Sequence, residues 1–130
     1  MTSIRLGIAL AAIGVALGAL GAHALANVLE PPALTSYLTA VRYQIYHAFA
    51  LILLGLYHLQ TKEAIRTPYL LMSIGVVLFS GSIYGLTLLP LLDISARWLG
   101  PITPIGGLLL IFGWMTWLWT TFKKKSALGD

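Results

Sequence analysis

Eight polar side chains interrupt stretches of sequence that are otherwise apolar, which makes them the natural candidates for a binding site or a reaction. They comprise two imidazoles, a guanidinium, a carboxamide, a phenol and three hydroxyls: His23, Arg42, Gln44, His47, Ser80, Ser82, Tyr84 and Thr103. A guanidinium suits an anionic group, and a histidine can change its charge near neutral pH. These residue types indicate recognition of a polar ligand, provided that the fold brings them together.

The stretch from Thr39 to His58, TAVRYQIYHAFALILLGLYH, carries three of these candidates and is long and apolar enough to cross a bilayer. A polar group in the hydrocarbon requires a partner or a function, because there is no water to solvate it. Gln44 and His47 fall on one helical face, which they share with Leu51, Gly55 and His58. We expect this face to line the interior of the protein, with Arg42 lying off it.

The composition determines the class of protein. Of the 130 residues, 58% are hydrophobic and only 9% are charged, whereas a typical soluble domain is about 45–50% apolar and about 25% charged. So few ionic groups cannot solvate the surface of a soluble globule. We therefore predict an integral membrane protein with a single domain over residues 1–130. The chain contains no cysteine, which excludes disulfides and thiolate metal ligands.

Four apolar segments are long enough to span a membrane, at approximately residues 4–26, 36–60, 67–91 and 99–122. The connections are short, so consecutive spans run antiparallel and predict an all-α, up-down-up-down four-helix bundle. Basic residues gather on the side of both termini: Arg5, Lys62, Arg66 and Lys123 to Lys125. The positive-inside rule then predicts that both termini are cytoplasmic. The lysine run is expected to anchor to anionic lipid.

Small residues recur along the first span at alternating spacings of four and three: Gly7, Ala11, Gly14, Gly18 and Gly21. This spacing places them in one seam of the helix, where another backbone can approach closely. We expect the seam to serve helix packing.

The fourth span opens with GPITPIGG, which contains two prolines and three glycines within residues 100–107. This composition predicts a kinked or partly unwound helix, because proline removes a backbone donor and glycine weakens a helix interior. Irregular backbone at membrane depth is tolerated only where it faces protein or water. Discontinuous helices of this kind line substrate sites in transporters, so this stretch is weak evidence for a binding site.

In this topology the eight polar candidates come from all four spans, and nearly all of them map to the half of the bilayer opposite the termini. Two interpretations are open. In the first, the side chains meet in a polar pocket. In the second, they form hydrogen bonds between helices that hold the bundle together, worth about 0.6 kcal/mol per contact.

The residues give little support to three specific chemistries. A haem held between His23 and His47 needs two axial ligands facing each other, and nothing in the sequence fixes that geometry, so we expect no cofactor. A zinc site is disfavoured by the lack of cysteine. We expect no enzyme, because the spans carry no carboxylate and no Ser-His-Asp spacing, and no nucleic-acid partner, because the basic residues are not spread along one face.

The strings GALGAHAL, YLTAVRYQIYHAFALILLGL, LFSGSIYGLTL and GPITPIGGLLLIFGW, together covering roughly residues 6–117, resemble a known family. It is the domain-of-unknown-function family of small membrane proteins typified by the bacterial inner-membrane proteins YgdD and YwdK, with eukaryotic relatives. The resemblance implies four spans, a location in the bacterial inner (plasma) membrane and no settled activity. The family pattern carries over at Gly21, His23, Tyr43, Gln44, His47, Ser80, Gly81, Ser82, Tyr84, Thr103, Pro104 and Gly106.

Two classes of function compete. In the first, the protein is a binding or transport module, and a small molecule, ion, proton or lipid occupies the polar pocket, with Arg42 and His47 as its main contacts. In the second, the protein is a structural or accessory subunit that packs against a larger membrane complex through its small-residue seam. Four spans leave little room for transport by a monomer, so a transporter of this size is expected to form a homo-oligomer.

Overall fold

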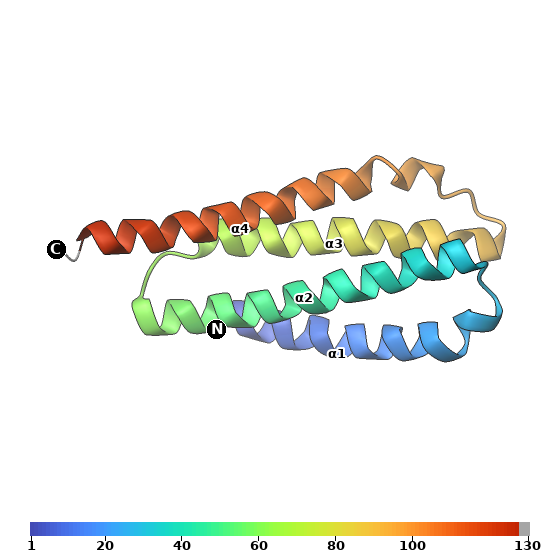
Figure 1. Cartoon of the computed structure of the whole chain (residues 1–130), viewed down its shortest axis with the longest axis horizontal. Coiled ribbons are helices and arrows are strands. Elements are labelled where there is room, and N and C mark those ends of the chain that lie inside the picture. The colour runs from blue at the N-terminus through green and yellow to red at the C-terminus, as the bar shows by residue number, and fades with distance from the viewer. Residues whose placement is uncertain (128–130) are drawn as a thin grey trace.

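A computed structural model describes the backbone of residues 1–127 and the side chains of residues 1–122. Four long α-helices make up this part of the chain (Figure 1): α1 (Thr2–His23), α2 (Pro31–Thr61), α3 (Arg66–Leu88) and α4 (Ile102–Ala127). Short 3-10 turns complete the connections: η1 (Leu25–Asn27), η2 (Leu89–Leu92) and η3 (Arg97–Leu99). Each of the four helices is long and apolar enough to cross a membrane. The prediction of an all-α, four-span membrane bundle is confirmed.

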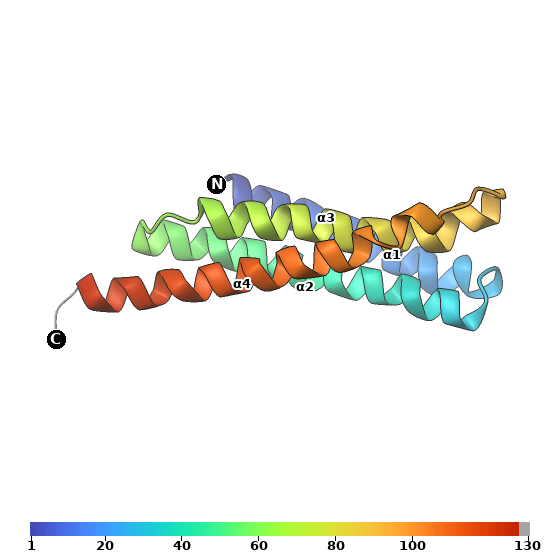
Figure 2. The same ribbon diagram turned by 90° about the horizontal axis from the view of Figure 1, so that it is seen from above.

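The helices pack in the order in which they occur in the chain. Extensive contacts join α1 to α2, α2 to α3 and α3 to α4, whereas α1 and α4 share no such contact within residues 1–127. Figure 1 shows this order across the molecule, and Figure 2 shows the same helices from above. In the most apolar stretch of α2, 50% of the residues are buried, compared with 17% for α1 and α4. The bundle is therefore open, with α2 and α3 at its centre and α1 and α4 at its edges.

The two ends of the bundle differ in what they carry. Both termini and the α2–α3 connection lie toward one end, which we call the terminal end, and the other two connections lie at the opposite, loop end (Figure 1). Arg5, Lys62 and Arg66 belong to the terminal end, and Arg42 and Arg97 to the loop end. The lipid anchor predicted for Lys123 to Lys125 concerns side chains that lie outside the described residues.

Helix α2 begins at Pro31, five residues before the expected start of its span. Pro31 and Pro32 occupy the first turn, where the backbone N–H has no partner within the helix and the fixed φ of proline fits. The helix ends at Thr61, and the next residue, Lys62, caps it with a left-handed φ of 62° that turns the chain toward α3. The earlier start adds Thr35 and Ser36 to α2, which matters for the site described below.

Helix α4 begins at Ile102. The prediction of a kinked or partly unwound backbone over residues 100–107 is therefore wrong for residues 102–107, which are helical, whereas Gly100 and Pro101 lie in the turn before the helix. Pro101 precedes the helix and Pro104 lies in its first turn, where a missing N–H breaks no helical hydrogen bond. Gly106 and Gly107 continue the helix without interruption.

Glycines allow the closest approaches between helices. A Cβ added to Gly106 of α4 would lie 2.4 Å from the Phe79 backbone nitrogen of α3. On α1, a Cβ at Gly7 would lie 2.6 Å from the Ala48 carbonyl oxygen, and one at Gly21 would lie 2.8 Å from the Tyr37 ring. The seam of α1 thus lies against α2, with Ala11 and Gly18 half-buried beside it. Close van der Waals packing of this kind is a main source of association between helices in lipid.

The glycine contacts give a matched pair of substitutions. Gly106→Val places side-chain atoms against the backbone of α3, and we expect it to destabilise the fold by about 1–3 kcal/mol or more. Gly81→Ala meets nothing within 4 Å and replaces a poor helix former by a good one, so its melting temperature in detergent should equal or exceed that of the wild type. Equal melting temperatures for the two variants would show that the α3–α4 contact is not tight.

Candidate functional site

Six of the eight polar candidates form hydrogen bonds that join helices, and two do not. The six are Gln44, His47, Ser80, Ser82, Tyr84 and Thr103. His23 is exposed, and Arg42 is exposed on the outer side of α2. The structure therefore does not gather all eight around one pocket.

Gln44 is the centre of the hydrogen bonding between helices. Its side chain is only 4% exposed. Its Nε2 donates to the Leu10 carbonyl of α1 at 2.8 Å, and its Oε1 accepts from the Tyr84 hydroxyl of α3 at 2.9 Å. The Tyr84 ring also packs against that of Tyr37, with ring centroids 5.2 Å apart. One carboxamide of α2 thus connects three helices.

His47 is buried at 6% exposure, and the partners of both ring nitrogens fix its tautomer. Nδ1 lies 2.8 Å from the Tyr43 carbonyl, which can only accept, so Nδ1 carries the hydrogen. The Trp114 indole N–H, which can only donate, lies 3.2 Å from Nε2. His47 is therefore a neutral bridge from α2 to α4, and neither nitrogen is free for a ligand. This role of Trp114 could not be predicted from the sequence, because an aromatic residue in an apolar span is ordinary.

Three small hydroxyls also join helices. Ser80 of α3 donates to the Ala40 carbonyl of α2 at 2.9 Å. Ser82 Oγ lies 2.7 Å from Thr103 Oγ1 of α4 and 3.0 Å from the Phe79 carbonyl of its own helix. Because the carbonyl can only accept, Ser82 donates to it and Thr103 donates to Ser82.

His23 lies far from His47. It is in the last turn of α1, and Gly21, two residues earlier, faces Tyr37 of α2. His47 is ten residues beyond Tyr37, about 15 Å along the helix axis. The two histidines therefore do not face each other as the axial ligands of a haem must. Among the described residues, no group of three or more His, Asp or Glu side chains is placed to hold a metal ion.

A hollow of about 460 Å³ opens at the loop end, between the first turns of α2, the last turns of α3 and the start of α4. We call it the loop-end hollow. Five hydroxyl-bearing side chains line it, together with apolar ones: Pro32, Ala33, Thr35, Ser36, Thr39, Ile83, Leu86, Thr87 and Thr103. Of the eight predicted candidates it contains Thr103, and Arg42 lies beside it, since Arg42 Nη2 donates to Thr39 Oγ1 at 3.0 Å.

All five hydroxyls already donate their hydrogen bonds to other groups of the protein. Thr35, Ser36 and Thr39 donate to the carbonyl four residues earlier, at 2.9 Å, 3.0 Å and 2.9 Å. Thr87 donates in the same way to Ile83 at 2.9 Å, and Thr103 donates to Ser82. A hydroxyl has one proton and two lone pairs, so this surface can accept hydrogen bonds but has few to give. Thr35, Ser36, Thr39 and Thr87 were not among the predicted site residues, although the four-residue spacing of Thr35 and Thr39 on one helical face was visible in the sequence.

Four membrane-length helices with short connections and an interior held by paired polar groups define a small four-span integral membrane protein. The sequence model of the protein family of unknown function DUF423 matches residues 17–107. The chain belongs to this family, which confirms the resemblance noted from its sequence.

Relatives of the chain are UPF0382 membrane proteins from bacteria and a yeast. The protein from Staphylococcus haemolyticus is 41% identical over 120 residues, covering 92% of this chain and 94% of the relative. The one from Schizosaccharomyces pombe is 43% identical over 107 residues, with coverages of 82% and 89%. YwdK of Bacillus subtilis is 39% identical over 114 residues, with coverages of 86% and 89%. No solved structure shows a significant match.

The hydrogen bond from Tyr84 to Gln44 can be tested by removing one hydroxyl. Tyr84→Phe leaves the Gln44 carboxamide oxygen without its partner, and we expect a loss of about 0.6 to 1.7 kcal/mol in the free energy of unfolding in bicelles. Tyr46→Phe is the control, because the Tyr46 side chain is 59% exposed. If both substitutions have the same effect, the bond does not stabilise the bundle.

Proposed function

We propose that the protein binds a phospholipid whose headgroup carries an ammonium group, as in phosphatidylethanolamine, in the loop-end hollow. The observation that carries the proposal is the row of five hydroxyls whose protons are already donated to the protein. An ammonium group has only donors to offer. It therefore complements a surface that can only accept.

The backbone at this site supports the same interpretation. The start of a helix normally presents free N–H donors, which favour anions. Here the first two positions of α2 are Pro31 and Pro32, which have no N–H. The N–H of Leu34 already donates to the Glu30 carbonyl at 3.0 Å. The donors that would compete with an ammonium group are thus largely absent from this part of the hollow.

Arg42 suits the other charge of such a headgroup. Its guanidinium is exposed and is held next to the hollow by the hydrogen bond to Thr39. A guanidinium is the preferred side chain for a phosphate. A zwitterionic headgroup carries a phosphate and an ammonium a few bonds apart, so Arg42 and the hydroxyls can contact both at once. Of the two main ligand contacts predicted from the sequence, the proposal keeps Arg42. It drops His47, because both of its ring nitrogens already have hydrogen-bond partners.

The position of the hollow supports a headgroup site. It opens at an end of the bundle, beside the connections, and the exposed Trp98 of η3 belongs to the same end. Tryptophan is enriched at the level of the headgroups. We further propose that the terminal end is cytoplasmic in a bacterial plasma membrane, because it carries Arg5, Lys62 and Arg66.

We infer binding rather than catalysis at this site. Among the described residues, no imidazole or carboxylate lines the hollow, so its hydroxyls have no adjacent base to activate them as nucleophiles. Each hydroxyl proton is instead donated to a backbone carbonyl or to Ser82.

Native mass spectrometry of the detergent-purified protein with added phosphatidylethanolamine tests the proposal. The combined substitution Thr35→Val, Thr39→Val and Thr87→Val keeps the shape of the side chains and removes three acceptors. We expect at least a tenfold rise in Kd, because a hydrogen bond to a charged group contributes about 1.5–3 kcal/mol and about 1.4 kcal/mol is tenfold. Phosphatidylcholine with the same acyl chains should bind the wild type more weakly, since its methylated nitrogen has no N–H.

The matched control replaces three threonines of α4 that also donate to their own helix: Thr116, Thr120 and Thr121. Their triple valine variant should bind phosphatidylethanolamine with the wild-type Kd. An unchanged Kd in the triple valine variant of the loop-end hollow would overturn the proposal. An equal rise in Kd in both triple variants would also overturn it.

A second candidate function, as a subunit of a homo-oligomer or a larger membrane complex, is favoured by the outer face of α1. Small residues recur there at spacings of three and four and are exposed: Ala9, Ala12, Ala16 and Ala19. Such a face permits close packing of another helix. In polymer-extracted native nanodiscs, Ala16→Phe should then shift the particle to lower mass, while Leu108→Phe on the exposed face of α4 should not. A wild-type particle with the mass of one chain would exclude this candidate.

A further inference from the structure

A hollow of about 250 Å³ lies in the middle of the bundle, between α1 and α3. We call it the middle hollow. Its walls are mostly apolar side chains of α1 and α3, among them Leu10, Ile13 and Val76, and α2 contributes Gln44. Both α1 and α3 pack on α2, but no extensive contact joins them to each other within residues 1–127. The hollow is therefore open on the side away from α2.

The middle hollow lies at the depth of the hydrocarbon core. Ile13 is the twelfth of the 22 residues of α1, and Val76 is the eleventh of the 23 residues of α3. Helices of this length span about 33 Å, and the hydrocarbon of a bilayer is about 30 Å thick. The hollow is thus distant from both headgroup layers. Its occupant must be a molecule, or part of a molecule, that dissolves in hydrocarbon.

Gly81 leaves space in the middle hollow that no group of the described residues fills. The other two glycines of α3 are in tight contacts. An added Cβ would lie 2.8 Å from the Leu110 side chain at Gly75 and 2.3 Å from the Leu99 side chain at Gly85. A Cβ at Gly81 would meet nothing within 4 Å, although glycine weakens the interior of a helix. Packing within the chain accounts for the other two glycines but not for Gly81, which points to a group from outside the chain.

The middle hollow also has one hydrogen-bond donor that the protein does not use. A carboxamide has two N–H donors. Gln44 Nε2 donates one to the Leu10 carbonyl, and no group within residues 1–122 accepts the other. The hydroxyls of Ser80 and Tyr84, which also line the hollow, donate to Ala40 and to Gln44. Because an N–H in hydrocarbon is costly without an acceptor, the hollow is suited to an apolar molecule that carries one.

The size and depth of the hollow restrict the molecule further. Sites that enclose a whole ligand measure about 300–1,000 Å³, so a hollow of about 250 Å³ takes one compact group and leaves the rest of the molecule in the lipid. A lipid hydroxyl stays near the interface, because moving an O–H donor into hydrocarbon is costly. The ring of an isoprenoid quinone is compact, carries carbonyl acceptors and no donor, and is attached to a long apolar tail.

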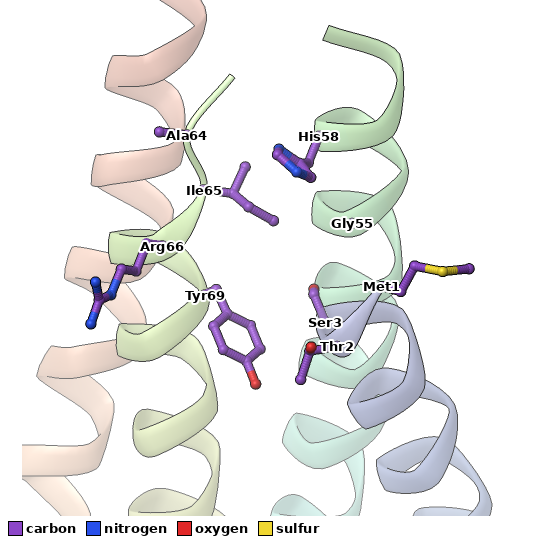
Figure 3. A pocket seen from close by; sticks show the side chains of 9 residues that line it. All are labelled: Met1, Thr2, Ser3, Gly55, His58, Ala64, Ile65, Arg66 and Tyr69. Carbon is purple, nitrogen blue, oxygen red and sulfur yellow. The ribbon is translucent and has the colours of Figure 1, made fainter. Parts of the chain in front are cut away.

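The space between α1 and α3 continues from the middle hollow to the terminal end. There the same two helices and the last turns of α2 line a hollow of about 360 Å³. Tyr69 belongs to its lining and lies seven residues before Val76, on the same face of α3. Figure 3 shows the Tyr69 hydroxyl pointing toward Thr2 and Ser3 of α1 across this hollow. The separation of α1 from α3 thus leaves room beside the bundle for a tail.

We propose that the middle hollow binds the ring of an isoprenoid quinone. One ring carbonyl accepts a hydrogen bond from Gln44 Nε2, and the ring lies against the backbone at Gly81. The tail runs between α1 and α3 toward the terminal end. This site differs from the loop-end hollow in depth and in chemistry, and the proposal does not rest on the function proposed there.

The first test is the Kd of a decyl-substituted benzoquinone, measured by native mass spectrometry on the full chain in detergent. Gly81→Leu fills the hollow and should raise this Kd about tenfold or more. Its melting temperature should stay at the wild-type value, because the new side chain enters open space. Ala12→Leu introduces the same side chain on an exposed part of α1 outside the hollow and should leave the Kd within about twofold. An unchanged Kd in Gly81→Leu would overturn the proposal.

The second test uses the wild-type chain and a different ligand, so it does not depend on the folding of a variant. Decylbenzene has the same tail on a ring without carbonyls and should bind about fivefold more weakly or worse. Equal Kd values for the two compounds would assign the hollow to any apolar chain, such as a lipid acyl chain, and would overturn the quinone proposal. The triple valine variant of the loop-end hollow should bind the quinone with the wild-type Kd, so the two proposals can fail separately.

The hydrogen bond itself can be followed by nuclear magnetic resonance of isotope-labelled protein. The chain has two glutamines, Gln44 and the exposed Gln60, so the second is an internal control. Added quinone should shift the side-chain amide resonances of Gln44 and leave those of Gln60 in place, whereas decylbenzene should produce a smaller shift at Gln44. No shift at Gln44 with the quinone, or equal shifts with both compounds, would show that its amide does not hold the carbonyl and would overturn the site.

Discussion

The bundle depends on hydrogen bonds that pair most of the polar side chains buried from water; among the described residues, the Tyr57 hydroxyl and Ser73 Oγ are buried without a partner. Lipid gives no hydrophobic driving force between helices, so packing at glycines and hydrogen bonds must hold them together. Glycines do this within the pairs α1–α2 and α3–α4. Gln44 connects the pairs, because its carboxamide binds the Leu10 carbonyl on one side and the Tyr84 hydroxyl on the other. The remaining polar pairs, including His47 with Trp114, add links of the same kind.

The sequence predicted the number of helices and the inward-facing side of α2, because both follow from apolar runs and helical periodicity. It did not predict the partners of the inward residues. Trp114 contacts His47 because α4 packs on α3 at Gly106 and Gly113, which sets the rotation of α4. No local pattern reports that rotation. His23 and Arg42 were placed in the pocket by depth alone, and depth does not fix the direction in which a side chain points.

Small errors in helix boundaries had large consequences for the site. A start at Ser36 leaves Thr35 in a connection, whereas the true start at Pro31 makes residues 35, 36 and 39 part of one helix. Only within a helix do their hydroxyls donate to the carbonyl four residues earlier and become acceptors toward the hollow. The error at the start of α4 had the same origin: Pro104 breaks a helix that begins at Leu99 but fits the first turn of one that begins at Ile102.

The centre of the bundle argues against a transport route through it. Leu51, Leu54 and Met72 are fully buried. Gln44 and Tyr84, which border a hollow of about 250 Å³, are hydrogen-bonded to each other, and His47 is hydrogen-bonded to Trp114. A path between the ends would break several of these bonds at once, each in a medium that cannot replace them with water. The loop-end hollow instead opens to the surroundings of the bundle. A centre held by these bonds, with a hollow open at one end, supports the proposal of binding at that end rather than passage across the membrane.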